Sequence, residues 1–244
     1  MRPIQRGDSP QATDFANYED AKPFLVSRLG RYCSYCERRV QTNLAVEHIQ
    51  PKGLKAYEPL AGRWDNFLLG CVNCNSTKKN KDVVLSEALL PDRDNTAMAY
   101  DYLADGQINV AMSVPAICRP KADSLLQLVG LDKPISEVLD ENGKQVALDR
   151  VSQRMDLWGI ALDTKQDVDD NPGNEAVRRG AVRTAVAEGF FSIWMIVFAS
   201  DTDMRLRLIN AFPGTRGSGC FDPTSGLPIQ PAPNPDNLAN GGKL

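Results

Sequence analysis

Two pairs of cysteines have the spacing of metal ligands. Cys33 and Cys36 are separated by two residues, and so are Cys71 and Cys74. This gap lets both thiolates of a pair reach one tetrahedral ion, and four thiolates leave no open coordination position. We therefore expect a structural Zn²⁺ that joins the two ends of the segment between the pairs. The alternative, a thioredoxin-like redox pair, needs only one such pair and a βαβ setting.

The chain has a single histidine, His48, which restricts the mechanisms available to it. A helical H-E-x-x-H zinc protease needs two histidines and is excluded. A mechanism with a histidine base must use His48, whose ordinary pKa of about 6.5 suits proton transfer. Glu47 and Asn75 offer hard oxygen atoms, which Mg²⁺ or Mn²⁺ prefers. Neighbouring residues of a strand point to opposite faces, so Glu47 and His48 can share an ion only where the strand ends or bends, and Gln50-Pro51 favours a bend.

The order of these residues resembles the HNH endonucleases. In that family an acidic residue and a histidine end a strand, an asparagine follows in a loop, and C-x-x-C, a histidine or asparagine and a lysine come next. The resemblance implies a ββα-metal fold braced by a four-cysteine zinc site, with Asn66 holding the loop that aims the histidine. The implied catalytic residues are Glu47, His48, Asn66 and Asn75, with Lys78 nearby and with Glu47 and Asn75 as ligands of the divalent ion.

Three longer strings are similar to a narrower group, the long-form HNH proteins of bacterial antiphage systems. They are Y-C-S-Y-C-E at 32–37, E-H-I-Q-P-K at 47–52 and N-F-L-L-G-C-V-N-C-N at 66–75. In Septu systems and some retrons, a PtuB-like nuclease of this group accompanies a PtuA-like ATPase. The resemblance covers about residues 18–135 and implies a defence nuclease that works with an ATPase partner.

Positive charge is concentrated around these motifs. Residues 28–81 contain ten Lys/Arg and four Asp/Glu, a net charge of +6 in a chain of net charge −3. A basic segment in an acidic protein is typical of a polyanion-binding surface, here one for DNA, although a solvated basic face gives the same count. We expect Lys52, Lys78 and Lys79 to contact phosphate, the last two beside a helix start that adds its dipole.

The rest of the sequence predicts the elements that position these residues. The chain has 244 residues, 42% hydrophobic and 24% charged, which is ordinary for a globular protein. We expect an α+β fold: a zinc-stapled ββα-metal (HNH) nuclease module with a mostly helical C-terminal lobe. Helices are predicted over 18 or 22–29, 122–129, 148–162, 177–199 and 204–212, strands near 45–49 and 67–70, and a hairpin around 102–110.

The predicted parts are a loose N-terminal arm (1–17), the nuclease module (18–115), the helical lobe (116–221) and a disordered tail (222–244). The most apolar run, 190–199, is too short to span a bilayer, which needs about 20 apolar residues. The N-terminus lacks a secretory signal, so we expect a cytoplasmic protein that does not bind membranes.

These observations predict a metal-dependent HNH endonuclease that hydrolyses phosphodiester bonds in DNA, with a structural Zn²⁺ and a catalytic Mg²⁺ or Mn²⁺. Two alternatives remain open. One is a non-catalytic, zinc-stapled nucleic-acid-binding adaptor. The other is a stand-alone, restriction-like HNH enzyme, although the second half of the chain shows no strong basic cluster beyond Arg178, Arg179 and Arg183.

Overall fold

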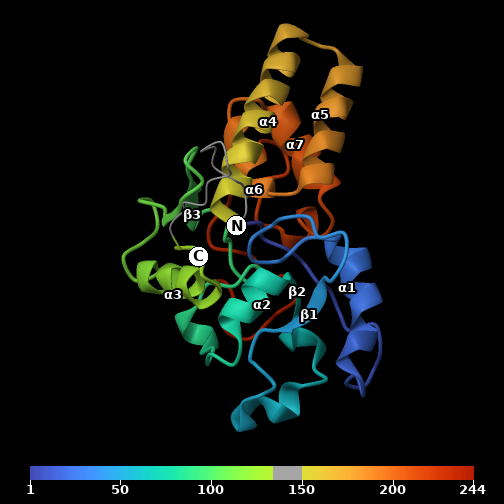
Figure 1. The fold of residues 1–244 in the computed structure, drawn as a ribbon, viewed down its shortest axis with the longest axis vertical. Helices are drawn as coiled ribbons and strands as arrows, with labels where there is room; N and C mark the ends of the chain where they lie inside the picture. The colour runs from blue at the N-terminus through green and yellow to red at the C-terminus, as the bar shows by residue number, and fades with distance from the viewer. Residues whose placement is uncertain (134–149) are drawn as a thin grey trace, which may run out of the picture.

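The described residues of the chain fold around two small antiparallel sheets, with helices packed on and beside them (Figure 1). The computed structural model describes residues 1–133 and 150–244. Helices α4 (Arg150–Asp170) and α5 (Glu175–Glu188) form a hairpin that projects from the body, at the top of Figure 1. This mixture of helices and small sheets agrees with the predicted α+β class. In the part of the chain that the structure describes, no helix is both long enough and apolar enough to cross a membrane.

The first sheet and the helix after it form a ββα unit. β1 (Ala45–His48) pairs with β2 (Phe67–Gly70) in antiparallel register, so that His48 lies opposite Phe67. α2 (Val72–Lys78) begins almost directly after β2. Both strands lie where the apolar runs of the sequence predict them. β1 ends at the histidine itself, which meets the condition that the strand must stop or bend there.

The first residues of the chain pack into the core. Met1, Ile4 and Arg6 are almost fully buried, and the Met1 ammonium donates to the carbonyl of Thr96 at 3.0 Å. The predicted loose arm is therefore wrong for this end of the segment 1–17, because its apolar side chains fill the core and its arginines find buried partners. The predicted helix follows as η1 (Tyr18–Ala21) and α1 (Lys22–Leu29).

A second sheet and a third helix complete this half of the molecule. β3 (Tyr100–Tyr102) and β4 (Ile108–Val110) form the predicted hairpin. α3 (Arg119–Val129) ends at Gly130, whose φ of 65° is the left-handed conformation that favours glycine. Besides η1, the described residues form the short 3₁₀ helices η2 (Lys55–Leu60), η3 (Trp64–Asn66), η4 (Leu85–Glu87) and η5 (Arg216–Ser218).

The C-terminal lobe consists of α4, α5, α6 (Phe191–Val197) and α7 (Thr202–Ala211). α4 corresponds to the helix predicted over 148–162, whose first two residues lie outside the described part. The single helix predicted over 177–199 is wrong, because the chain breaks at Gly189. A Cβ on this glycine would lie 2.6 Å from the nitrogen of Arg39 and 2.7 Å from the carbonyl oxygen of Glu37. The lobe therefore turns where it meets the first cysteine loop.

The C-terminal residues do not form the predicted disordered tail. The amide of Lys243 donates to Asp94 Oδ1 at 2.9 Å, and the amides of Gly242 and Asn95 donate to the carbonyls of Arg93 and Leu244. The polar tail therefore finds its hydrogen-bond partners in the buried segment 92–96 rather than in water.

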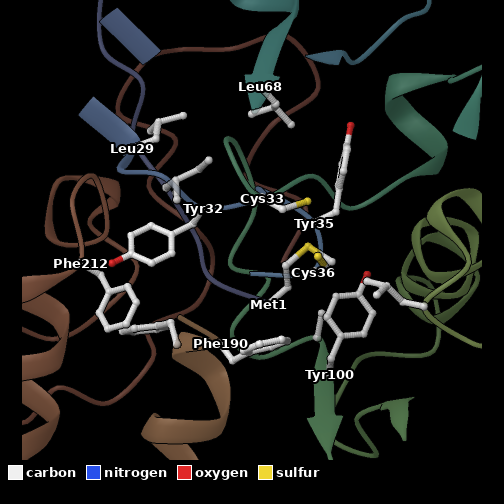
Figure 2. Close-up of a cluster of buried hydrophobic side chains, with 14 of the residues drawn as sticks. Met1, Leu29, Tyr32, Cys33, Tyr35, Cys36, Leu68, Tyr100, Phe190 and Phe212 are labelled. Carbon is white, nitrogen blue, oxygen red and sulfur yellow. The ribbon is translucent and has the colours of Figure 1, made fainter. Parts of the chain in front are cut away.

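The C-terminal lobe and the first half of the chain, here called the module, share one hydrophobic core. Figure 2 shows Phe190 and Phe212 of the lobe in the same cluster as Tyr32 and Cys36 of the module. Across the same boundary, the Tyr32 hydroxyl donates to the carbonyl of Val186 at 2.7 Å. The lobe is therefore packed on the module, and the exact division near residue 115 stays a prediction.

Candidate active site and zinc site

The four predicted zinc ligands lie together in the core. The Sγ atoms of Cys33, Cys36, Cys71 and Cys74 are all within 4.8 Å of one another. Burial raises the pKa of the Cys33 thiol, which means that the thiolate form is unfavourable there without a positive charge. Four adjacent thiolates therefore need a cation between them. A closed set of four sulfurs fits a tetrahedral structural Zn²⁺. Within the described residues, no second group of three or more His, Cys, Asp or Glu side chains is arranged to hold a metal.

The cysteine loops are attached to the ββα unit. The amide of Ser34 donates to the carbonyl of Leu69 at 2.7 Å, and the amide of Leu69 donates to Ser34 Oγ at 3.2 Å. The first loop therefore adds to the edge of β2. In the second pair, Cys71 directly precedes α2 and Cys74 lies in its first turn. A metal bound by both pairs would fix α2 against β2.

His48 is held in one orientation at the end of β1. Its Nε2 lies 3.0 Å from the carbonyl oxygen of Ala61, and the rings of Tyr18 and Phe67 contact it with centroids at 4.9 and 5.2 Å. A carbonyl only accepts hydrogen bonds, so Nε2 carries the hydrogen and Nδ1 presents a lone pair in the neutral ring. Burial lowers the pKa of His48, which favours that neutral form near pH 7.

The two oxygens of the buried Glu47 carboxylate have different surroundings. Lys78 Nζ lies 2.9 Å from Oε1, and the Tyr35 hydroxyl donates to the same oxygen at 3.3 Å. No hydrogen bond to Oε2 is present within the described part of the chain. Burial raises the pKa of Glu47, and the Lys78 ammonium opposes that shift. One oxygen is therefore fixed, and the other is left for a ligand.

Asn75 supplies a second unpaired oxygen beside Glu47. Its Oδ1 is buried and has no hydrogen-bond partner, an arrangement that usually costs about 1–3 kcal/mol. A Cβ on Gly70 would lie 2.3 Å from this oxygen and 3.1 Å from the Cβ of Glu47. The Asn75 amide and the Cβ of Glu47 thus both lie against Gly70. Amide and carboxylate oxygens are the donors that Mg²⁺ or Mn²⁺ prefers.

Asn66 holds the loop that follows β1. Its Oδ1 accepts from the amide of Gln50 at 2.8 Å, and its Nδ2 donates to the carbonyls of Gln50 and Leu60 at 3.0 and 3.3 Å. The next residue after Leu60 is Ala61, whose carbonyl binds the histidine. Asn66 therefore ties the residues after β1 to the end of η2. This pattern is compatible with the role that the resemblance implies, namely holding the loop that aims His48.

The three lysines predicted to contact phosphate occupy different places. Lys78 is only 2% exposed, and its ammonium is bound inside the site. It also lies at the end of α2 rather than at a helix start. The prediction of a surface phosphate contact is therefore wrong for Lys78. Lys52 and Lys79 are exposed, and the Lys52 ammonium lies 3.5 Å from the centroid of the Tyr18 ring, beside the histidine.

The basic segment 28–81 does not form one open face. Arg28 donates to the carbonyl of Arg6, Arg38 donates to Asn73 Oδ1, and Lys81 donates to carbonyls at the end of α3. Lys78 is buried, and Arg28, Arg38 and Arg39 are half-buried. The other basic residues of the segment are exposed and could meet a polyanion: Arg31, Lys52, Lys55, Arg63, Lys79 and Lys81.

Three residues of this site were missed by the sequence analysis: Tyr18, Tyr35 and Gly70. Tyr35 lies inside the first C-x-x-C and Gly70 immediately precedes the second, so position next to a ligand was the available signal. No sequence pattern indicated Tyr18 as a site residue, because only the folded structure brings η1 to the end of β1.

Comparison with protein families agrees with this geometry. A family model described as HNH endonuclease matches residues 33–81. The matched segment contains β1, β2, α2 and all four cysteines. The match supports the HNH family and, with it, a nuclease function in general. A comparison with curated proteins gives no match.

Proposed function

We propose that the chain is a metal-dependent endonuclease that hydrolyses phosphodiester bonds in DNA. The observation that carries the proposal is the buried, unpaired Oδ1 of Asn75, which lies beside Gly70, as does the Cβ of Glu47. His48, the residue after Glu47, offers the base that such a reaction needs. The HNH family match at residues 33–81 supports the reaction class.

His48 is the proposed general base. Because its Nε2–H donates to the carbonyl of Ala61, Nδ1 is the atom that takes a proton from water. The lowered pKa keeps that nitrogen unprotonated near pH 7. The ring contacts with Tyr18 and Phe67 limit its rotation, so the lone pair keeps one direction.

Glu47 and Asn75 are the proposed holders of Mg²⁺ or Mn²⁺. When bound, such an ion supplies charge stabilisation to a phosphate oxygen and to the departing oxygen. Lys78 and Tyr35 occupy Oε1 of Glu47 and leave Oε2 for the ion. They are positioning residues, since they act on the reaction through Glu47.

We also propose that this nuclease is the effector of a bacterial antiphage system and works with an ATPase partner. The sequence resemblance over residues 18–135 supports this role. The chain has a net charge of −3, so a partner that delivers DNA would compensate for weak intrinsic binding. The lobe is the proposed contact, although α6 buries most of the apolar run 190–199 and leaves Ile196, at 40% exposed, as its most open apolar side chain.

The test is cleavage of supercoiled plasmid, single-stranded DNA and RNA by zinc-loaded protein, with Mg²⁺, Mn²⁺ or EDTA. We expect DNA cleavage with either ion and none in EDTA. Binding without cleavage under every condition would favour the adaptor alternative, and cleavage at fixed sequences without any partner would favour the restriction-like one. Cleavage of RNA alone would contradict the proposed substrate. Co-purification with the product of a neighbouring ATPase gene tests the partner.

A further inference from the structure

The first turn of α4 lies against the cysteine cluster. Arg150 is 9% exposed, and its Nη1 lies 3.3 Å from the Sγ of Cys74. The same guanidinium donates to the carbonyls of Val129, at 2.8 Å, and Gly130 at the end of α3. Three contacts therefore hold this charge beside a metal-ligating sulfur.

A second arginine approaches the cluster from the first cysteine loop. Arg38 is half-buried and follows Cys36 by two residues, and its partner Asn73 stands between Cys71 and Cys74. Its guanidinium donates to Gln153 Oε1 at 3.0 Å and to Asn73 Oδ1 at 3.1 Å. Gln153 belongs to α4, so the same turn of the lobe that carries Arg150 also holds Arg38.

We propose that Arg150 and Arg38 neutralise the zinc–thiolate centre, so that the helical lobe forms part of the zinc site. Zn²⁺ with four thiolates carries two net negative charges, and a buried charge is costly unless it is paired and hydrogen-bonded. The two arginine charges together balance that charge. N–H donors to the sulfurs also stabilise the thiolate form, as outer-shell partners do at other metal sites.

This inference concerns the zinc site and stands apart from the proposed nuclease activity. Arg150 lies outside the matched HNH segment, 33–81, so the lobe adds a component that the segment lacks. Zinc retention should then depend on the position of α4. A displacement of the start of α4 would remove one arginine from the sulfurs and release the other from Gln153.

The experiment measures zinc affinity of the full chain by competition with a chromogenic chelator. Arg150→Met and Arg38→Met should each weaken zinc binding about 10- to 100-fold, the usual effect of losing an outer-shell partner. Arg179→Met is the matched control, because it removes an equal charge from an exposed position on α5, and it should leave the affinity unchanged. Arg150→Lys keeps the positive charge but loses the planar guanidinium with its several N–H donors. The zinc affinity of this variant should therefore lie between those of the wild type and Arg150→Met.

Circular dichroism of the zinc-loaded variants separates a zinc effect from misfolding. If Arg150→Met does not fold, the zinc affinity of Arg38→Met tests the proposal, because Arg38 is only half-buried. Folded Arg38→Met protein that binds zinc as tightly as the wild type would overturn the proposal. So would an equal loss of affinity in Arg179→Met, because the effect would then be one of net charge. Since zinc binding is read without DNA, neither result depends on cleavage.

Discussion

The Tyr35 hydroxyl lies 3.3 Å from Oε1 of Glu47, so the first cysteine loop touches the candidate metal ligand directly. Tyr35 stands between Cys33 and Cys36 in the sequence, and Asn75 follows Cys74. Each cysteine pair thus delivers one residue to the candidate active site. The four-cysteine cluster therefore helps to position the groups around the candidate metal ligands.

Replacing Tyr35 with phenylalanine tests this link. Tyr35→Phe removes one of the two hydrogen bonds to Oε1 of Glu47 and leaves the ring in the core. A single long hydrogen bond is a modest contribution, so we expect the Mg²⁺ concentration for half-maximal cleavage to rise about 2- to 10-fold. Zinc content should not change. An unaltered Mg²⁺ requirement would show that Lys78 alone fixes the carboxylate.

Gly70 should be required for the catalytic site and not for zinc. In Gly70→Ala the new Cβ would meet Oδ1 of Asn75 at 2.3 Å, so the amide must leave its place beside Glu47. We expect cleavage to fall by about 100-fold or more, in the range of a lost catalytic group, with zinc still bound.

The matched control is Gly159→Ala in α4, where an added Cβ meets no atom within 4 Å. It should retain full cleavage and gain up to about 1 kcal/mol of stability, as alanine favours a helix interior over glycine. Full activity in Gly70→Ala would mean that Asn75 is not a ligand.

The pH dependence of cleavage should report the His48 imidazole. Burial lowers its pKa below 6.5, the bond to Ala61 opposes the shift, and the charges of Lys52 and Lys78 add to it. Protonation removes the base, so kcat/KM should fall on acidification with a midpoint below 6.5.

Lys52→Met removes a nearby positive charge, which eases protonation and raises the His48 pKa. The acid limb should therefore move to higher pH. Lys165→Met, on the distant α4–α5 hairpin, loses the same charge and should leave the limb in place. A limb that stays fixed or moves to lower pH in Lys52→Met would contradict the assigned base.

A buried network of charged side chains should stabilise the position of β2. Asp92 lies 3.1 Å from Arg6 and 2.9 Å from Arg93, and Arg6 donates to the carbonyl of Phe67, the partner of His48 in the sheet. Asp92→Asn leaves two buried arginines without their charge partner, so we expect a loss of about 3–5 kcal/mol in urea unfolding.

The control for this variant is Asp169→Asn, which breaks the exposed pair with Lys165. Exposed pairs contribute little, so its stability should change by less than about 1 kcal/mol. If Asp92→Asn unfolds at the same urea concentration as the wild type, the network has no net stabilising role.

Local patterns predicted the four-cysteine cluster and the strand end well, because both depend on short spacings. The C-x-x-C pairs, the Glu47-His48 strand end and the hairpin at 100–110 all involve neighbours within a few residues. The helix break at Gly189 could not be read in this way, because its cause is a close approach to Glu37, distant in the sequence.

The sequence misled where a polar residue acquires a buried partner. Lys78 looks like a surface lysine, yet the Glu47 carboxylate and a carbonyl hold its ammonium inside the site. The polar tail looks disordered, yet Asp94 and its neighbours pair with it. Such long-range pairings leave no periodic signal along the chain.

The most direct test of the central claim compares plasmid cleavage by the wild type and His48→Ala at saturating Mg²⁺ or Mn²⁺. The account predicts a loss of about 10²- to 10⁴-fold, the usual effect of removing a general base, with zinc content and DNA binding unchanged. The chain has no other histidine to take over the role. Cleavage by His48→Ala at the wild-type rate would contradict the account.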